Sequence, residues 1–270
     1  MVSESWFQPT NFSGIFKRSY NFFRAYFLQI MRLTLLIMVP MQIVSMIAGR
    51  LVLIEGTLSL VGWTLMIITA IGGKMLLAAA IICISLDILL GTPSRTIGSV
   101  LKEATQYVTP LLLIDLTVIV VAGIIATFGA LIVQLFAGGT QSEIIQSTQL
   151  FLFMIAFFII YPRMFLAPFF IINEQAKVLE SLRKSVLLTN LNRPIVVVVF
   201  LGYLLLNLIV LWLNMAQPVL ALIAVMFVMP FSVLMLLFLY ISLRMNQEDF
   251  RTAIENLGKP NPDEGNEAVE

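Results

Sequence analysis

Five charged residues interrupt the long apolar runs of this sequence, and polar chemistry inside a membrane would take place at such positions. They are Arg32, Lys74, Asp87, Asp115 and Arg163. A charge in hydrocarbon is costly, so it usually pairs with another charge or lines a path for an ion, a proton or a head group. Helical rise puts Arg32, Asp115 and Arg163 about 8–14 Å below the inner surface. Asp87 is slightly shallower, and we therefore predict a neutral cluster of two arginines and two aspartates in the inner leaflet.

This cluster has two interpretations. The favoured one is a structural ion-pair network that fixes helix packing, or simple snorkelling of Arg32 toward the surface. The other is a polar path or a head-group site open to the cytoplasmic leaflet. Lys74 lies deeper or further outward and has no obvious acidic partner, so it either snorkels to the outer surface or is a functional charge. Asn207 and Asn214 are expected to make hydrogen bonds between helices.

The residue types that are absent exclude most enzyme chemistry. The chain has no histidine and one cysteine, which removes the usual general base, the Ser-His-Asp triad, disulfides and cysteine metal clusters. Cys83 lies in an apolar run and is expected to be a packing residue. Asp87 with Asp115 is the candidate carboxylate pair for acid–base work. We expect no catalytic residues, no metal, no cofactor and no nucleic-acid partner.

Composition places the chain in a membrane. Of its 270 residues, 60% are hydrophobic and 11% are charged, whereas soluble domains carry about 25% charged residues. The mean hydropathy is +0.99. Apolar runs of about 20 residues can span the hydrocarbon core, and the candidates are residues 26–49, 62–90, 110–137, 149–172, 195–216 and 219–243. The first run is expected to be retained as a helix and not cleaved as a signal peptide.

The distribution of basic residues predicts the orientation. With the N-terminus inside, the only base in an external loop is Arg50. The bases in cytoplasmic segments are Lys17, Arg18, Arg24, Arg95, Lys102, Lys177, Arg183, Lys184, Arg193, Arg244, Arg251 and Lys259. This bias follows the positive-inside rule and predicts that both termini are cytoplasmic.

Three of the cytoplasmic segments share one amphipathic pattern ahead of the odd-numbered spans. Each places mostly apolar residues at i, i+4 and i+11, a base beside the second, and a small residue at i+7, all on one face of a helix. The basic and small positions are Lys17, Arg18 and Ser19, then Lys102 and Ala104, then Arg183, Lys184 and Ser185. The small residues are 85 and 81 positions apart, which indicates a threefold internal repeat over residues 12–95, 96–177 and 178–258.

The predicted fold is a single all-α membrane domain over residues 1–258. Its six transmembrane helices form three helical hairpins, each preceded by a cytoplasmic amphipathic helix. The apolar faces of these amphipathic helices should meet acyl chains or the bundle, and their bases should meet anionic head groups. Membrane lipids are thus the expected partners, alongside other membrane-protein subunits. The acidic tail at 259–270 is expected to be disordered.

One stretch of the sequence has a family resemblance. Residues 163–174 place Arg163 in a span, an Ala-Pro-Phe stretch at 167–169 and the acid Glu174, followed by a helix with the basic-Ser element at 183–185. Residues 15–19 and 22–27 add a matching N-terminal opening. This pattern resembles bacterial YciC-like proteins and the membrane domain of some glycerophosphoryl diester phosphodiesterases. The resemblance implies a bacterial inner-membrane protein with six helices and without its own catalytic centre.

The first functional expectation is a non-enzymatic accessory or scaffold protein of a membrane complex or of envelope homeostasis. The alternative is a transporter or lipid-handling protein with a polar site in the inner leaflet. The alternative requires a cavity beside Lys74 or Asp115.

Overall fold

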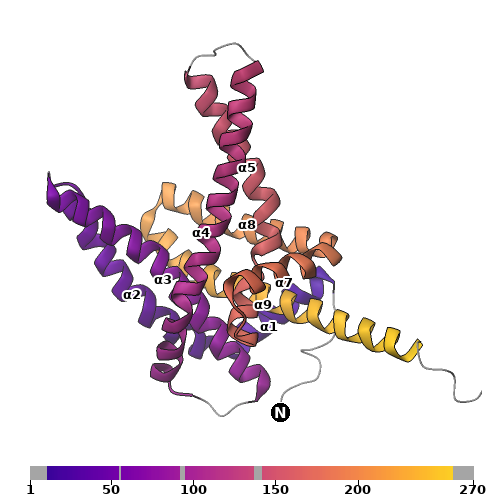
Figure 1. Cartoon of the computed structure of the whole chain (residues 1–270). Helices are drawn as coiled ribbons and strands as arrows, with labels where there is room; N and C mark the ends of the chain where they lie inside the picture. Colours follow the sequence, from indigo (N-terminus) through magenta and orange to yellow (C-terminus); the bar gives the residue numbers. More distant parts are fainter. Residues whose placement is uncertain (1–10, 55, 92–94, 137–141, 258–270) are drawn as a thin grey trace, which may run out of the picture.

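The computed structural model describes residues 11–54, 56–91, 95–136 and 142–257, and these residues are almost entirely helical (Figure 1). The helices are α1 (Phe12–Ala25), α2 (Phe27–Val52), α3 (Thr57–Leu90), α4 (Ile97–Phe136), α5 (Ser142–Met164), α6 (Ala167–Glu174), α7 (Val178–Leu191), α8 (Arg193–Ala216) and α9 (Pro218–Leu257). Six segments of the described chain are long and apolar enough to cross a membrane: Phe27–Val52, Thr57–Leu90, Ile97–Leu135, Gln146–Glu174, Arg193–Leu213 and Leu222–Met245. The predicted all-α membrane protein with six spans is confirmed. The acidic tail lies outside the described residues.

The spans pair as helical hairpins. Helix α2 packs along α3, α4 along α5, and α8 along α9. The tips of the α2–α3 and α4–α5 hairpins point away from each other, and the hairpins converge at their other ends, near α1 and α7 (Figure 1). Chain order puts α1, the start of α4 and α7 at this convergent end. We call it the basic end, because it holds Lys17, Lys102 and Arg183.

Helix α1 packs its apolar face on the bundle. Asn11 begins the helix by accepting a hydrogen bond at 3.0 Å from the backbone N–H three residues on, as asparagine commonly does at this position. Ile15, Ser19 and Phe22 are fully buried, and α1 contacts α9. Phe22 meets Phe238 edge to face, with ring centroids 5.6 Å apart. Of the two environments expected for this face, acyl chains or the bundle, the structure shows the bundle.

Helix α4 runs without a break from Ile97 to Phe136, so the expectation of a separate amphipathic helix before the third span is wrong. Pro110 lies inside the helix, where it removes one backbone donor. The helix continues because one stripe of side chains is buried on both sides of the proline. The stripe comprises Val100, Ala104, Leu111, Ile114, Val118, Ala122 and Ala126. Helix α9 likewise continues through Pro230 and ends at Leu257.

A break separates α5 from α6, and α7 satisfies the backbone there. Pro168, near the start of α6, has no backbone N–H to donate to the Met164 carbonyl, so a helical hydrogen bond is missing at this break. The carbonyl of Arg163 accepts hydrogen bonds from the Ser185 hydroxyl at 2.8 Å and from the Thr189 hydroxyl at 3.3 Å. These bonds replace a lost helical partner, which allows a broken helix inside a membrane. The predicted small anchors Ser19, Ala104 and Ser185 are all fully buried, while the threefold repeat itself stays a prediction.

Small residues let neighbouring helices approach closely, as expected in lipid. A Cβ atom at Gly62 of α3 would lie 2.6 Å from Val52 N and 2.8 Å from Ala48 O of α2. A Cβ atom at Gly129 of α4 would lie 2.7 Å from the Leu152 side chain of α5. The alanines that recur every fourth residue along α4, Ala122, Ala126 and Ala130, are buried.

Candidate functional site

Helices α3 and α4 bring Lys74 and Asp115 to the same level. The two helices run in opposite directions and contact each other. Lys74 lies sixteen residues before α3 ends at Leu90, and Asp115 lies eighteen residues after α4 begins at Ile97. At about 1.5 Å per residue, both side chains leave their helices about 24–27 Å from the α3–α4 loop. The expectation that Lys74 lies at another depth is therefore wrong, because it took the third span to begin near Pro110.

Both side chains line a central cavity of about 340 Å³. Its walls come from α3, α4, α5, α6, α8 and α9, and most of its lining is apolar, with residues such as Leu111, Phe165 and Val228. The polar and charged lining residues are Lys74, Asp115, Tyr161, Tyr203, Asn207 and Ser232. The cavity therefore combines apolar walls with a small polar set, as ligand sites commonly do.

Lys74 and Asp115 interact electrostatically across this cavity but do not form a salt bridge with each other. The charge of Lys74 acts on Asp115, yet within the described chain neither residue makes a salt bridge. Tyr161 and Tyr203 lie within hydrogen-bonding reach of each other, and both feel the charge of Asp115. Opposite charges thus face one space from neighbouring helices without direct contact.

Ser232 of α9 and Asn207 of α8 complete the polar lining. Ser232 is 3% exposed, and its hydroxyl has no hydrogen-bond partner among the described residues. A buried hydroxyl without a partner costs free energy, so the group is available to a molecule in the cavity. Asn207 donates one hydrogen bond from Nδ2 to the Tyr203 carbonyl at 2.8 Å.

Two further cavities flank the central one and share its polar residues. A cavity of about 330 Å³ between α4, α5 and α8 is lined by Asp115, Tyr161, Tyr203 and Asn207 together with apolar residues. A cavity of about 450 Å³ between α2, α3, α8 and α9 shares Lys74 and Asn207 with the central cavity. Together the three spaces are lined by residues of α2, α3, α4, α5, α6, α8 and α9.

A second polar assembly lies at the basic end and joins three helices. Glu174, at the end of α6, pairs with Lys184 of α7 at 2.9 Å and with Arg244 of α9 at 2.8 Å. Tyr240 donates to the Glu174 carboxylate at 3.1 Å and accepts a hydrogen bond from Asn173 at 3.3 Å. Every polar group of this assembly has a partner, so it acts as a structural clamp between α6, α7 and α9. The acid of the family-like motif is its centre.

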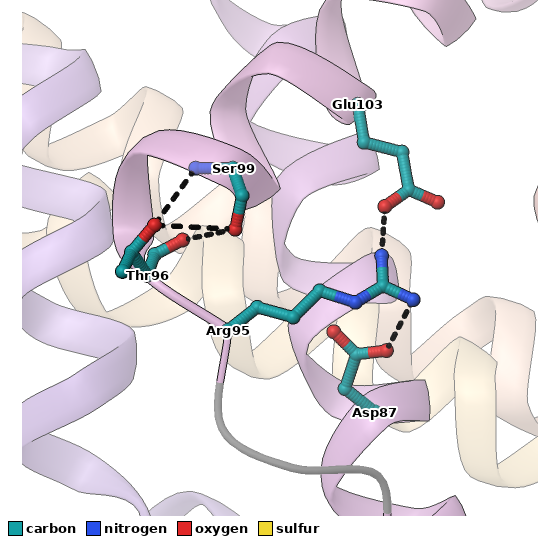
Figure 2. Close-up of polar contacts among 5 residues, drawn as sticks. All are labelled: Asp87, Arg95, Thr96, Ser99 and Glu103. Atoms are coloured by element: carbon teal, nitrogen blue, oxygen red, sulfur yellow. Dashed lines mark hydrogen bonds and ion pairs between the residues drawn. The ribbon is translucent and has the colours of Figure 1, made fainter.

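A third polar assembly closes the loop between α3 and α4. Arg95 lies between Asp87 of α3, at 3.3 Å, and Glu103 of α4, with which it also pairs (Figure 2). The Ser99 backbone N–H and hydroxyl face Thr96 at the start of α4, and the hydroxyl donates to the Thr96 carbonyl at 2.7 Å. These contacts join the end of α3 to the start of α4, outside the cavity that Lys74 and Asp115 line.

Ionisation at the basic end favours the charged state of the clamp. Hydrogen bonds that Lys184 donates to Glu180 and Glu174 raise its pKa above the ordinary 10.5, because they stabilise the ammonium form. The same contact lowers the pKa of Glu180 below its ordinary 4.5. Burial lowers the pKa of Arg18 in α1.

The structure divides the predicted four-residue cluster. Asp87 pairs with Arg95, and Asp115 lies on the cavity with Lys74. Arg32 and Arg163 have exposed side chains, and no salt bridge joins either of them to an acid in the described part of the chain. Of the predicted basic elements, Lys17, Lys102 and Arg183 are exposed, whereas Arg18 and Lys184 are half-buried.

Several residues of these sites were not predicted. In the sequence pattern, Tyr161 and Tyr203 look like ordinary apolar residues of their spans. A tyrosine hydroxyl in the middle of a span needs a hydrogen-bond partner, which was the available signal. Ser232 is one small hydroxyl in an apolar run and offers no signal of its own. Asn207 was expected to bond between helices, but its hydrogen bond lies within α8, and its side chain lines the cavity.

The described residues contain no group of three or more acidic or cysteine side chains that could hold a metal ion. Comparison with protein-family models, with curated proteins and with solved structures finds no match. The resemblance to YciC-like proteins therefore rests on the short motifs alone, and inferences about function depend on the geometry of the cavity.

Proposed function

We propose that this protein is a non-enzymatic lipid-handling membrane protein that binds a membrane amphiphile in its central cavity. The observation that carries the proposal is the pair Lys74 and Asp115 on the wall of one cavity of about 340 Å³, without a direct ion pair. A purely structural pair would be expected to close to contact distance, because each unpaired charge in a bilayer costs about 2.5–3.5 kcal/mol. A ligand that meets both charges offsets that cost.

The shape and lining of the cavity favour an amphiphile over a fully hydrophilic solute. A hydrophilic solute needs polar partners on most of its surface, whereas the polar groups here come mainly from α3, α4, α5 and α8. Apart from Ser232, the lining residues from α6 and α9 are apolar. The cavity volume lies within the range of about 300–1,000 Å³ that small-molecule sites occupy. A head group beside the charges and a tail along the apolar walls would use both kinds of surface.

The proposed orientation sets the depth of the site. Basic residues of α1, α4 and α7 at one end of the bundle support a cytoplasmic location for that end and for both termini. The resemblance to YciC-like proteins favours the inner membrane of a bacterium. Lys74 and Asp115 lie about 24–27 Å along their helices from the α3–α4 loop at the basic end, so the proposed site is deep within the bilayer. The accessory or scaffold role stays a prediction, since nothing in the described residues identifies a partner surface.

The proposal is tested by counting lipids that stay bound to the purified protein. The protein is reconstituted with an equimolar mixture of phosphatidylethanolamine and phosphatidylglycerol, extracted in mild detergent and examined by native mass spectrometry. We expect one retained lipid in the wild type and its loss in Lys74→Met and Asp115→Asn. The matched controls are Lys17→Met, an exposed lysine of α1, and Asp87→Asn, an aspartate outside the cavity; both should keep the lipid.

Folding is checked by size-exclusion chromatography of every variant. A wild type that retains no lipid, or cavity variants that retain it as well as the controls do, would refute a lipid site at Lys74 and Asp115.

A further inference from the structure

Resting on the proposed function, we infer that the cavity selects a zwitterionic head group, one with a primary ammonium and an anionic phosphate or carboxylate. The juxtaposition that carries this inference is one cation and one anion on neighbouring helices, facing the same space. The site as a whole is neutral. A head group of a single sign would satisfy one of these charges and be repelled by the other.

Lys74 suits the anionic part of such a head group. It lies on α3 where the central cavity meets the space toward α2, and its ammonium offers up to three donors to phosphate or carboxylate oxygens. Ser232, on the α9 wall, adds a buried hydroxyl without a partner among the described residues. Its unmade hydrogen bond leaves a donor and an acceptor available to a polar ligand, since most buried hydroxyls are paired.

Asp115 suits the ammonium part. Its carboxylate accepts hydrogen bonds, and the hydroxyls of Tyr161 and Tyr203 lie close enough to feel its charge. A primary ammonium has three N–H donors, which matches one carboxylate and two hydroxyl acceptors that line the same spaces from α4, α5 and α8. A quaternary ammonium has no N–H donor and would leave these acceptors unpaired. The site therefore favours an ethanolamine-type head group over a choline-type one.

The flanking spaces favour a lipid over a water-soluble zwitterion as the source of this head group. On the Asp115 side the cavity continues along Val118, Ile119 and Leu204. On the Lys74 side it continues along Met38 and Met41 of α2. These apolar walls are suited to acyl chains, and a free head group would leave them without contacts.

Binding of defined short-chain lipids tests the inference. Delipidated protein in detergent is titrated with phosphatidylethanolamine, phosphatidylcholine and phosphatidylglycerol of equal chain length, and Kd values are obtained by native mass spectrometry. We expect phosphatidylethanolamine to bind at least about tenfold more tightly than either other lipid. Free phosphoethanolamine, added as a competitor, should displace it only weakly. Displacement at equal concentration would overturn the lipid as the source and assign the site to a soluble zwitterion.

Variants separate loss of selectivity from loss of folding. Asp115→Asn leaves Lys74 as the sole charge of the pair, so the weaker binding that remains at high lipid concentration should favour phosphatidylglycerol, a reversal that misfolding does not produce. The exchange variant, Lys74→Asp with Asp115→Lys, keeps both charges and should keep the preference for phosphatidylethanolamine. The control Asp87→Asn should match the wild type.

Two outcomes distinguish failure of the head-group inference from failure of the proposed lipid site. Equal Kd values for all three lipids in the wild type, with binding still lost in the cavity variants, would overturn the zwitterion inference and leave the proposed lipid site standing. No binding of any lipid by the wild type would overturn both.

Discussion

Replacing Gly62 by alanine tests the close contact that positions α3, the helix that carries Lys74. A Cβ atom at Gly62 would lie 2.6 Å from Val52 N and 2.8 Å from Ala48 O, both backbone atoms of α2. Backbone atoms cannot turn aside as a flexible side chain can, so the helices would have to separate by up to about 1 Å. Gly72, in the same helix, is the matched control, because an added Cβ there would meet nothing within 4 Å.

The expected magnitude follows from the comparison of these two substitutions. Both exchange a glycine inside a helix for alanine, which by itself stabilises a helix by about 0.5–1 kcal/mol. That gain cancels in the difference between the variants. Forcing one extra carbon into a close-packed contact costs about 1–3 kcal/mol. We therefore expect Gly62→Ala to lower the free energy of unfolding by about 2 kcal/mol relative to Gly72→Ala.

Cys83 provides the assay, because it is the chain's one cysteine and its thiol, on α3, is buried in the hydrophobic core. A thiol-reactive maleimide labels it only when the bundle opens, so the labelling rate follows the population of the open state. About 1.4 kcal/mol corresponds to a tenfold change in that population. Gly62→Ala should therefore label about thirty times faster than Gly72→Ala at the same low concentration of SDS.

The reasoning would be refuted by equal labelling rates in the two glycine variants. It would also be refuted if Gly62→Ala labelled more slowly than the wild type, since the helix propensity of alanine would then outweigh the contact with α2.

Three further perturbations test the polar contacts at the basic end, each followed by the SDS concentration at half-unfolding. Ser185→Ala should lower the free energy of unfolding by about 1 kcal/mol, because the Arg163 carbonyl loses its 2.8 Å bond; an unchanged midpoint would contradict the role of that bond at the helix break. Glu174→Gln should cost about 1 kcal/mol through the ion pair with Arg244, and this cost should shrink in high salt, whereas a salt-independent loss would argue against charge as its cause. The raised pKa of Lys184 means that its stabilisation is fully present below its ordinary 10.5 and is lost as the pH rises through the higher folded value. Lys184→Gln should remove that alkaline loss, and a variant that loses stability as the wild type does would assign it to other groups.

Local pattern predicted much of the basic end. The recurring small position placed Ser19, Ala104 and Ser185 on one helix face, and all three are fully buried. The i, i+4 and i+7 spacing is a property of the helix itself, so it can be read before the neighbours of the helix are known. The ion pair between Asp87 and Arg95 was within reach of the same reasoning, because the two residues flank one short loop.

Residues that meet across the bundle were harder to predict. The sequence pattern placed Lys74 and Asp115 at different depths because it indicated that the third membrane span begins near Pro110. In the structure, α4 continues through Pro110. The family-like motif singled out Glu174 as a site residue. The motif did not predict its ion-pair partners, Lys184 and Arg244, which lie on two later helices. No periodicity within one helix encodes such a meeting.

The amino-acid sequence by itself determined that this chain forms six long apolar helices, since backbone groups in hydrocarbon must be satisfied within the helix and length alone decides what can span. Only the tertiary structure decided which charges share a cavity. Helices of similar hydropathy can associate through several faces, and the choice depends on close contacts such as the one at Gly62. The diverging hairpins leave space between α3, α4 and α8, and that space turns two isolated charges, Lys74 and Asp115, into one candidate site.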